Sequence, residues 1–218
     1  MIILITGGAD SGKSTYAEKI IQKLGVDNLY IATMEKESSE AAARIMKHRK
    51  MREHLNIDTL ERKKYFYNNE YVLFKDKTLN NGNKKIFEDT ENVNNLQKSS
   101  NIKDYFKISK SIKDYDAVLL ECIGNLVANH MFSDSFNKGY EEIYSELKKD
   151  VDYLINNSKN IIFVTNEVSN EIIDYSEETI DYIKTINKIS SYIAFKGDIL
   201  VEVVHGFAKF IKGKDIFE

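Results

Sequence analysis

A glycine-rich run near the start of this 218-residue sequence restricts its fold more than any other feature. Residues 1–6 are almost entirely apolar, which is typical of a short strand buried in a parallel sheet. Residues 7–14 then match the pattern of Gly, any four residues, Gly, Lys and Ser, and residues 14–24 carry apolar side chains at helical spacing. A strand, this loop pattern and a helix in that order predict a phosphate-binding loop.

The residue types of this loop suit the binding of a nucleoside triphosphate. Glycines let backbone N–H groups curl around phosphate oxygens, and the helix that follows directs its positive dipole end at the same phosphates. A lysine supplies a mobile positive charge to the β- and γ-phosphates, and a hydroxyl after it can coordinate Mg²⁺. We therefore expect nucleotide binding by Gly7, Gly8, Ala9, Asp10, Ser11, Gly12, Lys13 and Ser14, with Lys13 catalytic and Ser14 a metal ligand.

The rest of the chain alternates between predicted strands and helices. Strands are expected at 28–33, 117–122, 160–165 and 198–204, and helices at 38–54, 140–155 and 177–194. This order predicts an α/β fold of the P-loop NTPase type, with a mostly parallel sheet and helices on both faces. A last strand at 207–211 would pair with 198–204 across His205-Gly206, forming a C-terminal β-hairpin.

We interpret residues 1–218 as a single nucleotide-binding domain with a surface insertion at residues 63–115. The insertion contains nine Asn and the turn pair Asn81-Gly82, which favours a hairpin there. The nucleotide fold would then occupy the remaining residues on both sides of it.

Composition limits the classes of protein that the chain can belong to. Lys and Arg number 31 and Asp and Glu 34, so the net charge of −3 disfavours a protein that coats nucleic acid. The single cysteine, Cys122, excludes an internal disulfide. The sequence has neither a run of about 18 apolar residues that would predict a membrane span nor the features of a secretory signal, so we expect a cytoplasmic protein.

Two carboxylates are placed to complete a metal site beside the phosphate loop. Glu121 ends the apolar run Val118-Leu-Leu-Glu, and Glu167 follows the apolar run that ends at Val164. Ligands gather at the carboxyl ends of strands in an open α/β sheet, so both carboxylates should lie near the loop. Glu121 is the candidate for nucleotide and Mg²⁺ binding; the alternative is a strand-end carboxylate that simply faces solvent.

A histidine lies within a concentration of arginines in the predicted helix at 38–54. Arg44, His48 and Arg52 are spaced i, i+4 and i+8, and three of the four arginines of the chain lie in residues 44–52. Neighbouring positive charges disfavour the protonated imidazole, which leaves His48 available as a nucleophile. The alternative is a solvated basic helix face, and the other histidines are expected to be structural: His54, His130 and His205.

Five segments together resemble one enzyme family. They are Ile5-Thr-Gly-Gly-Ala-Asp-Ser-Gly-Lys-Ser14, Tyr30-Ile-Ala-Thr33, Arg44-Ile-Met-Lys-His48-Arg49 with Arg52, Val118-Leu-Leu-Glu-Cys122 with Asn129, and Val164-Thr-Asn-Glu-Val168. The chain is similar to the bifunctional adenosylcobinamide kinase/adenosylcobinamide-phosphate guanylyltransferases of cobalamin biosynthesis. The resemblance covers residues 1–62 and 116–212.

The resemblance implies two reactions and their residues. A nucleoside triphosphate, ATP or GTP, phosphorylates adenosylcobinamide; GTP then guanylylates His48, and the phosphorylated corrinoid takes the GMP to give adenosylcobinamide-GDP. It also implies a homotrimeric assembly, while Mg²⁺ as cofactor follows from the phosphate loop and Glu121. By the same resemblance, the residues that help to hold the guanine nucleotide are Ala32, Thr33, Met34, Arg49, Lys50, Met51, Arg52 and Glu61.

The chain departs from the family pattern at two places. Gly124 stands where the family usually has Thr, and residues 169–174 replace a Gly-x-Gly-Ile-Val-Pro stretch in a chain that contains no proline. Two alternatives therefore stay open: another small-molecule kinase of the same fold, and a protein that binds GTP without turnover. A regulatory GTPase is disfavoured because the sequence lacks an Asn-Lys-x-Asp motif.

Overall fold

The computed structural model describes residues 1–34, 57–61, 64, 66–68, 73–76, 85–86, 105–108, 111–132, 139–168 and 175–214. Several predictions lie outside these residues: the helix at 38–54 that carries His48, the turn at Asn81-Gly82 and the altered stretch at 169–174. The remaining predictions can be compared with the structure directly.

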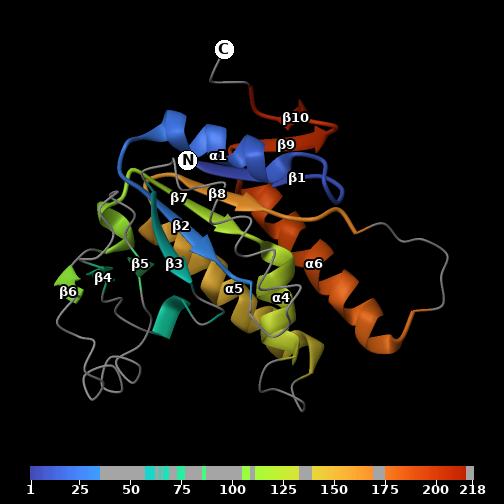
Figure 1. The fold of residues 1–218 in the computed structure, drawn as a ribbon. Helices are drawn as coiled ribbons and strands as arrows, with labels where there is room; N and C mark the ends of the chain where they lie inside the picture. Colours follow the sequence, from blue (N-terminus) through green and yellow to red (C-terminus); the bar gives the residue numbers. More distant parts are fainter. Residues whose placement is uncertain are drawn as a thin grey trace.

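One twisted sheet of eight strands forms the centre of the molecule, in the order β10-β9-β1-β8-β7-β2-β3-β5 (Figure 1). All neighbouring strands are parallel except the antiparallel pair β9 and β10, so the predicted α/β fold with a C-terminal hairpin is confirmed. The bounds are β1 Ile2–Thr6, β2 Asn28–Ala32, β3 Ile57–Glu61, β5 Lys85–Ile86, β7 Ala117–Glu121, β8 Ile161–Val164, β9 Ile199–Val204 and β10 Phe207–Lys212.

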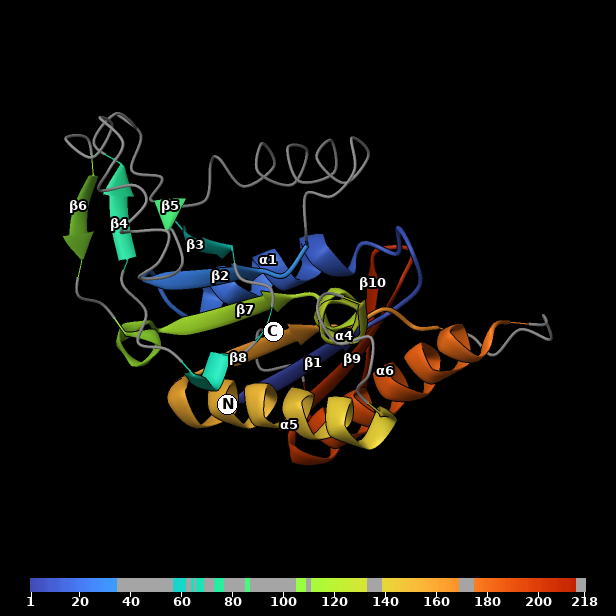
Figure 2. The same cartoon turned by 90° about the horizontal axis from the view of Figure 1, so that it is seen from below.

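Helices cover both faces of this sheet. Helix α1 (Lys13–Leu24) lies on one face, and α4 (Ile123–Phe132), α5 (Tyr140–Asn157) and α6 (Glu177–Lys196) lie on the other (Figure 2). Helices α5 and α6 begin at their predicted residues and run two residues beyond the predicted ends. Helix α4 and strand β3 were not predicted: α4 is a short, mostly apolar segment, and β3 has five residues of which three are polar, so neither has a distinctive period.

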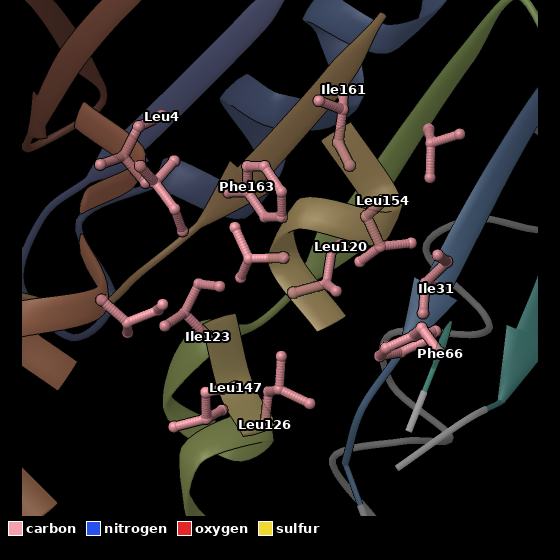
Figure 3. Close-up of a cluster of buried hydrophobic side chains, with 14 of the residues drawn as sticks. Leu4, Ile31, Phe66, Leu120, Ile123, Leu126, Leu147, Leu154, Ile161 and Phe163 are labelled. Atoms are coloured by element: carbon pink, nitrogen blue, oxygen red, sulfur yellow. The ribbon is translucent and has the colours of Figure 1, made fainter. Parts of the chain in front are cut away.

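The core consists of two clusters, one on each face of the sheet. The larger cluster joins the sheet to α4, α5 and α6 and includes Leu120, Phe163, Ile123, Leu147 and Leu154 (Figure 3). The smaller one packs α1 against the opposite face. Strands β1, β7 and β8 are thus enclosed on both sides, which explains why their sequences are continuous apolar runs without alternation.

The segment predicted as a surface insertion is more integrated than the sequence indicated. It contains η1 (Phe66–Asn68), an antiparallel pair of β4 (Leu73–Asp76) and β6 (Tyr105–Ile108), strand β5, and η3 (Ile112–Asp114). Phe66, Ile112 and Tyr115 near its two ends are buried in the larger cluster, and β5 extends the main sheet. Their burial against distant helices could not be inferred from local composition.

A polar network inside the core joins this segment to the helices. The Asp150 carboxylate lies 2.8 Å from Nε2 of His130 and accepts the backbone N–H of Phe66 through its other oxygen. His130 and Asp150 are fully buried. The structure thus gives His130 a structural position, as expected. Within the described ranges, no helix combines the length and apolar character needed to cross a membrane.

Candidate nucleotide and metal site

The phosphate loop lies at the carboxyl end of β1, between the central sheet and α1. Asp10 and Gly12 adopt left-handed backbone angles, with φ of 53° and 91°, and Gly12 is the N-cap of α1. A Cβ on Gly7 would lie 2.4 Å from the Val203 carbonyl oxygen, so the loop approaches β9 too closely for a side chain there. These positions explain two of the glycines of the pattern in steric terms.

Neighbouring strands hold the loop in place through its main chain. The N–H of Glu167, just after β8, donates to the Gly7 carbonyl at 3.0 Å. The N–H of Gly206, in the turn between β9 and β10, donates to the Ser11 carbonyl at 2.8 Å. The loop is therefore fixed from two sides, and the predicted place of Glu167 beside it agrees with the structure, although its side chain is exposed.

The lysine of the loop lies within it. The Lys13 side chain is 8% exposed, and its Nζ donates to the Gly8 carbonyl at 2.9 Å. Ser11 is also buried, and its Oγ has no hydrogen-bond partner among the described residues. The loop thus combines a positive charge with an unsatisfied hydroxyl, an arrangement that suits a ligand rich in anionic oxygens.

A hydroxyl and a carboxylate meet beside the loop, as the sequence predicted. Ser14 Oγ donates to one oxygen of Glu121, and Tyr30 Oη donates to the other at 2.6 Å. Tyr30 is 3% exposed, whereas Ser14 and Glu121 are partly exposed. Hard oxygen donors of this kind fit Mg²⁺, which commonly takes few protein ligands and completes its shell with phosphate oxygens and water.

No group of three or more His, Cys, Asp or Glu side chains that could hold a metal ion occurs in the part of the chain that the structure describes. Ser14 and Glu121 are the residues that would hold the ion.

Thr33 connects the end of β2 to the end of β7. Its hydroxyl donates to the Cys122 carbonyl at 3.0 Å and accepts the Cys122 N–H at 2.9 Å, while its own N–H donates to the Glu121 carbonyl. Asn129 of α4 donates to the Thr33 carbonyl at 2.8 Å. Thr33 is fully buried, so its side chain serves the fold, and Ala32 and Met34 on either side are partly exposed.

The pairing of three neighbouring strands places side by side three residues that the sequence predicted to bind nucleotide. Ala32 lies opposite Glu121 on β7 and opposite Glu61 on β3, at the carboxyl ends of the three strands. The other residues predicted to hold the guanine nucleotide, and the predicted nucleophile, lie outside the described residues: His48, Arg49, Lys50, Met51 and Arg52. The structure therefore assembles the phosphate and metal part of the predicted site.

Sequence reasoning gave Tyr30 no role, although a tyrosine inside a fully buried strand was a usable signal. A buried phenol needs a hydrogen-bond partner. That partner, Glu121, is 91 positions away in the sequence, and only the pairing of β2 with β7 identifies it.

A phosphate loop that opens a helix, with a hydroxyl and a strand-end carboxylate beside it, defines a P-loop protein that binds nucleoside triphosphates. The sequence model of one family within this class, cobinamide kinase / cobinamide phosphate guanyltransferase (CobU), matches residues 3–78 and 88–211. The chain belongs to this family. It is a bifunctional kinase and guanylyltransferase of cobalamin biosynthesis, which confirms the function predicted from the resemblance.

Individual known proteins are related to the chain at different levels. The bifunctional adenosylcobalamin biosynthesis protein CobU of Escherichia coli K12 is 27% identical over 222 residues, which cover 97% of this chain and all of CobU. Two solved structures from Pyrococcus horikoshii OT3, that of project PH0250 and the KaiC-like protein PH0186, are 11% and 13% identical. Each covers 98% of this chain, with 87% and 80% of the solved chains covered, at a TM-score of 0.45.

Proposed function

We propose that the chain acts on adenosylcobinamide in two steps that share the rim of the sheet around the phosphate loop. It first phosphorylates the aminopropanol hydroxyl with ATP or GTP, and it then adds GMP from GTP to give adenosylcobinamide-GDP. The observation that carries the proposal is the convergence of the Lys13 ammonium, the Ser14 hydroxyl and the Glu121 carboxylate at the start of α1.

In the kinase step, the loop binds the triphosphate through its backbone N–H groups and Lys13. The substrate hydroxyl oxygen forms a bond to the γ-phosphorus, the bond from that phosphorus to the β,γ-bridging oxygen breaks, and the nucleoside diphosphate leaves while the hydroxyl proton passes to solvent. Mg²⁺ held by Ser14 and Glu121 would offset the charge on the β- and γ-phosphates. Lys13 can exchange the Gly8 carbonyl for the phosphates, because an anionic phosphate oxygen is a stronger acceptor for an ammonium group than a neutral carbonyl.

In the guanylyl transfer, we propose His48 as the nucleophile. A neutral imidazole nitrogen attacks the α-phosphorus of GTP and pyrophosphate leaves; the phosphate of the corrinoid then displaces His48 and takes the GMP. The cations of the predicted helix offset the charge that develops on the phosphate oxygens. The supporting observation is the sequence spacing of Arg44, His48 and Arg52.

The guanine nucleotide would be held by Ala32 and Met34, by Glu61, and by Arg49, Lys50, Met51 and Arg52. Thr33 contributes indirectly: its hydroxyl is occupied by Cys122, so it fixes the main chain between Ala32 and Met34. We also propose a homotrimer, as the family resemblance implies. Light scattering on the eluting protein should then give three times the chain mass of 25.2 kDa.

The proposed role of His48 as nucleophile is tested with GTP labelled at the α-phosphate. The wild-type chain should become labelled, a peptide containing His48 should gain the mass of one GMP, and His48→Ala should remain unlabelled. His54→Ala, a histidine six positions away that is assigned no chemistry, is the matched control and should label normally. Absence of label on the wild type, or undiminished label on His48→Ala, would contradict the guanylyl-enzyme step.

The kinase step is tested separately with adenosylcobinamide and either nucleotide labelled at the γ-phosphate. Transfer of label to the corrinoid supports the proposal, and the ratio of the two rates gives the donor preference. Phosphorylation of a nucleoside or sugar in a substrate screen, with none of cobinamide, would contradict it.

A further inference from the structure

Polar groups from three different elements converge where the side chain of residue 124 would be. A Cβ on Gly124, in the first turn of α4, would lie 3.3 Å from Tyr182 Oη, 3.7 Å from Cys122 Sγ and 3.9 Å from Asn166 Nδ2. Cys122 follows β7, Asn166 follows β8, and Tyr182 belongs to α6. These groups gather closely around Gly124, and we call Tyr182, Cys122 and Asn166 the Tyr182 cluster.

The Tyr182 cluster borders the phosphate site. Cys122 adjoins the carboxylate of the proposed metal site, and the residue after Asn166 donates its N–H to the Gly7 carbonyl. Burial raises the pKa of the Cys122 thiol to about 11, while the Lys13 charge acts to lower it, so the loop lysine lies within electrostatic range. The cluster and the phosphate loop thus lie beside each other at the carboxyl end of the sheet.

The two sites approach this rim from opposite faces of the sheet. The phosphate loop leads into α1, whereas Tyr182 and Gly124 belong to α6 and α4 on the other face (Figure 2). In-line transfer requires the acceptor oxygen to approach the γ-phosphorus opposite the leaving group. An acceptor bound on the α4 and α6 face would reach the phosphates from the side opposite α1.

The chemistry of the cluster suits a ligand with hydroxyl and amide groups. The Asn166 side chain is exposed and has no hydrogen bond to any described residue, so its amide can both donate and accept. Tyr182 Oη donates to the Gly124 carbonyl over 3.3 Å and can still accept. The Tyr182 ring lies 6.4 Å from that of Phe132, which is 54% exposed, so an apolar surface adjoins the polar groups.

We propose that Tyr182 and Asn166 bind the acceptor arm of the corrinoid, the amide-linked aminopropanol, and direct its hydroxyl toward the γ-phosphate. Phe132 offers an apolar contact to the same ligand. This assignment of the substrate site rests on the proposed kinase function. It concerns residues that have no part in the phosphate chemistry.

Kinetics with two variants test the assignment. Tyr182→Phe and Asn166→Ala should each raise the KM for adenosylcobinamide about fivefold to tenfold, the loss expected for one hydrogen bond. The KM for the nucleotide and the extent of self-guanylylation should stay within about twofold of wild type. Equal rises in both KM values, or none in that for the corrinoid, would overturn the assignment.

The matched control is Tyr192→Phe. Tyr192 lies on the same helix, but its hydroxyl donates to Asp152 on α5, away from the rim. It should leave both KM values unchanged, and thermal unfolding of all variants confirms that they are folded. A shift in the KM for the corrinoid with Tyr192→Phe would show a general effect of α6 and overturn the assignment.

A binding measurement that needs no turnover uses Cys122, the single cysteine of the chain. Cys122 is a partly exposed residue, so its thiol can be alkylated with iodoacetamide in alkaline buffer. Adenosylcobinamide should slow alkylation at least fivefold in the wild type and much less in the Tyr182→Phe/Asn166→Ala double variant. An alkylation rate unaffected by the corrinoid overturns the assignment.

The two measurements separate this inference from the proposed function. Protection of Cys122 without phosphorylation of the corrinoid would refute the kinase proposal and support the binding site. Phosphorylation with unaltered KM in both variants would support the kinase and refute the binding site.

Discussion

Two carboxylates in this fold each make hydrogen bonds through both oxygens, yet they lie in very different places. Glu121 is partly exposed at the carboxyl end of β7 and accepts from the hydroxyls of Ser14 and Tyr30. Asp150 is fully buried on α5, paired with His130 and with the backbone N–H of Phe66. The same chemical group thus occurs once at the rim of the sheet and once within the core.

The difference lies in what each carboxylate can still do. Hydroxyl partners can turn aside or share a cation, so Glu121 can exchange its contacts when a metal and nucleotide arrive. The partners of Asp150 come from α4 and η1 and have no access to solvent, so breaking them leaves a buried charge without compensation. A rim carboxylate is available for chemistry, whereas a core carboxylate holds three elements together.

We expect the largest effect from a substitution that removes the cation beside the rim carboxylate. Lys13→Ala should lower kcat of the kinase reaction about a hundredfold to a thousandfold, since a preformed charge for the transferring phosphate is lost. Thermal unfolding should change little, because the side chain makes one hydrogen bond to the Gly8 carbonyl. Initial rates and a melting curve measure both quantities. Retained activity would show that the phosphate loop is not the working site.

The core carboxylate should show the opposite behaviour. Asp150→Ala should cost about 3 kcal/mol of unfolding free energy, because a buried polar network loses its centre, with normal nucleotide affinity in the folded protein. Asp152→Ala, two positions along the same helix at a partly exposed ion pair, should cost about 1 kcal/mol or less. Urea unfolding measures both losses. Similar losses in the two variants would remove the proposed distinction between buried and exposed sites.

Two buried tyrosines, each bonded to a carboxylate, test whether the contact to Glu121 matters for metal binding. Tyr30 donates to Glu121, and Tyr115 donates to Asp58 at 2.9 Å, away from the phosphate loop. Tyr30→Phe should weaken the binding of Mn²⁺, used as a spectroscopic substitute for Mg²⁺, about fivefold in the presence of a non-hydrolysable GTP analogue, because Glu121 loses the contact that orients it. Tyr115→Phe should leave Mn²⁺ binding unchanged. Equal effects would indicate a structural cause.

The smallest effect concerns a carboxylate at the surface. Partial burial acts to raise the pKa of Asp152, but hydrogen bonds from Lys148, Tyr192 and Lys196 outweigh it and bring the pKa below its ordinary value of 3.8. A lowered pKa stabilises the fold above the unfolded-state value and loses that effect as the pH falls further. Asp152→Asn should therefore be less stable than wild type at pH 7 by about 1 kcal/mol or less.

Urea unfolding at a series of pH values checks that the pKa of Asp152 is lowered in the folded protein. The difference between wild type and Asp152→Asn should shrink as the pH falls below about 4. A difference that grows toward low pH would contradict the assigned direction.

Sequence reasoning placed the residues of the candidate site correctly in the fold where the signal was local. The phosphate loop spans residues 7–14, which follow β1 directly and include the first two residues of α1, so its conformation depends on residues that are neighbours in the sequence. Glu121 was also predicted, because a carboxylate at the end of an apolar strand has a known place in a parallel sheet. Both inferences needed only the fold class and the order of elements.

Contacts between distant residues could not be predicted in this way. Two of the neighbours of Gly124, Tyr182 and Asn166, come from segments more than 40 positions farther along the chain, and Phe66 meets Asp150 across 84 positions. Local composition made the segment at 63–115 look like a surface insertion because it is rich in Asn. Its buried ends depend on the packing of α5 and on the place of β5 in the sheet.

The sequence by itself determined the α/β class, the phosphate loop and the membership of a cobinamide kinase and guanylyltransferase family, because these depend on short patterns in a fixed order. Only the tertiary structure decided what surrounds them: that Tyr30 holds Glu121, that Thr33 serves the fold, and that Tyr182 and Asn166 meet around Gly124. The physical reason is that strand register and helix packing, which sequence periodicity does not specify, place these side chains.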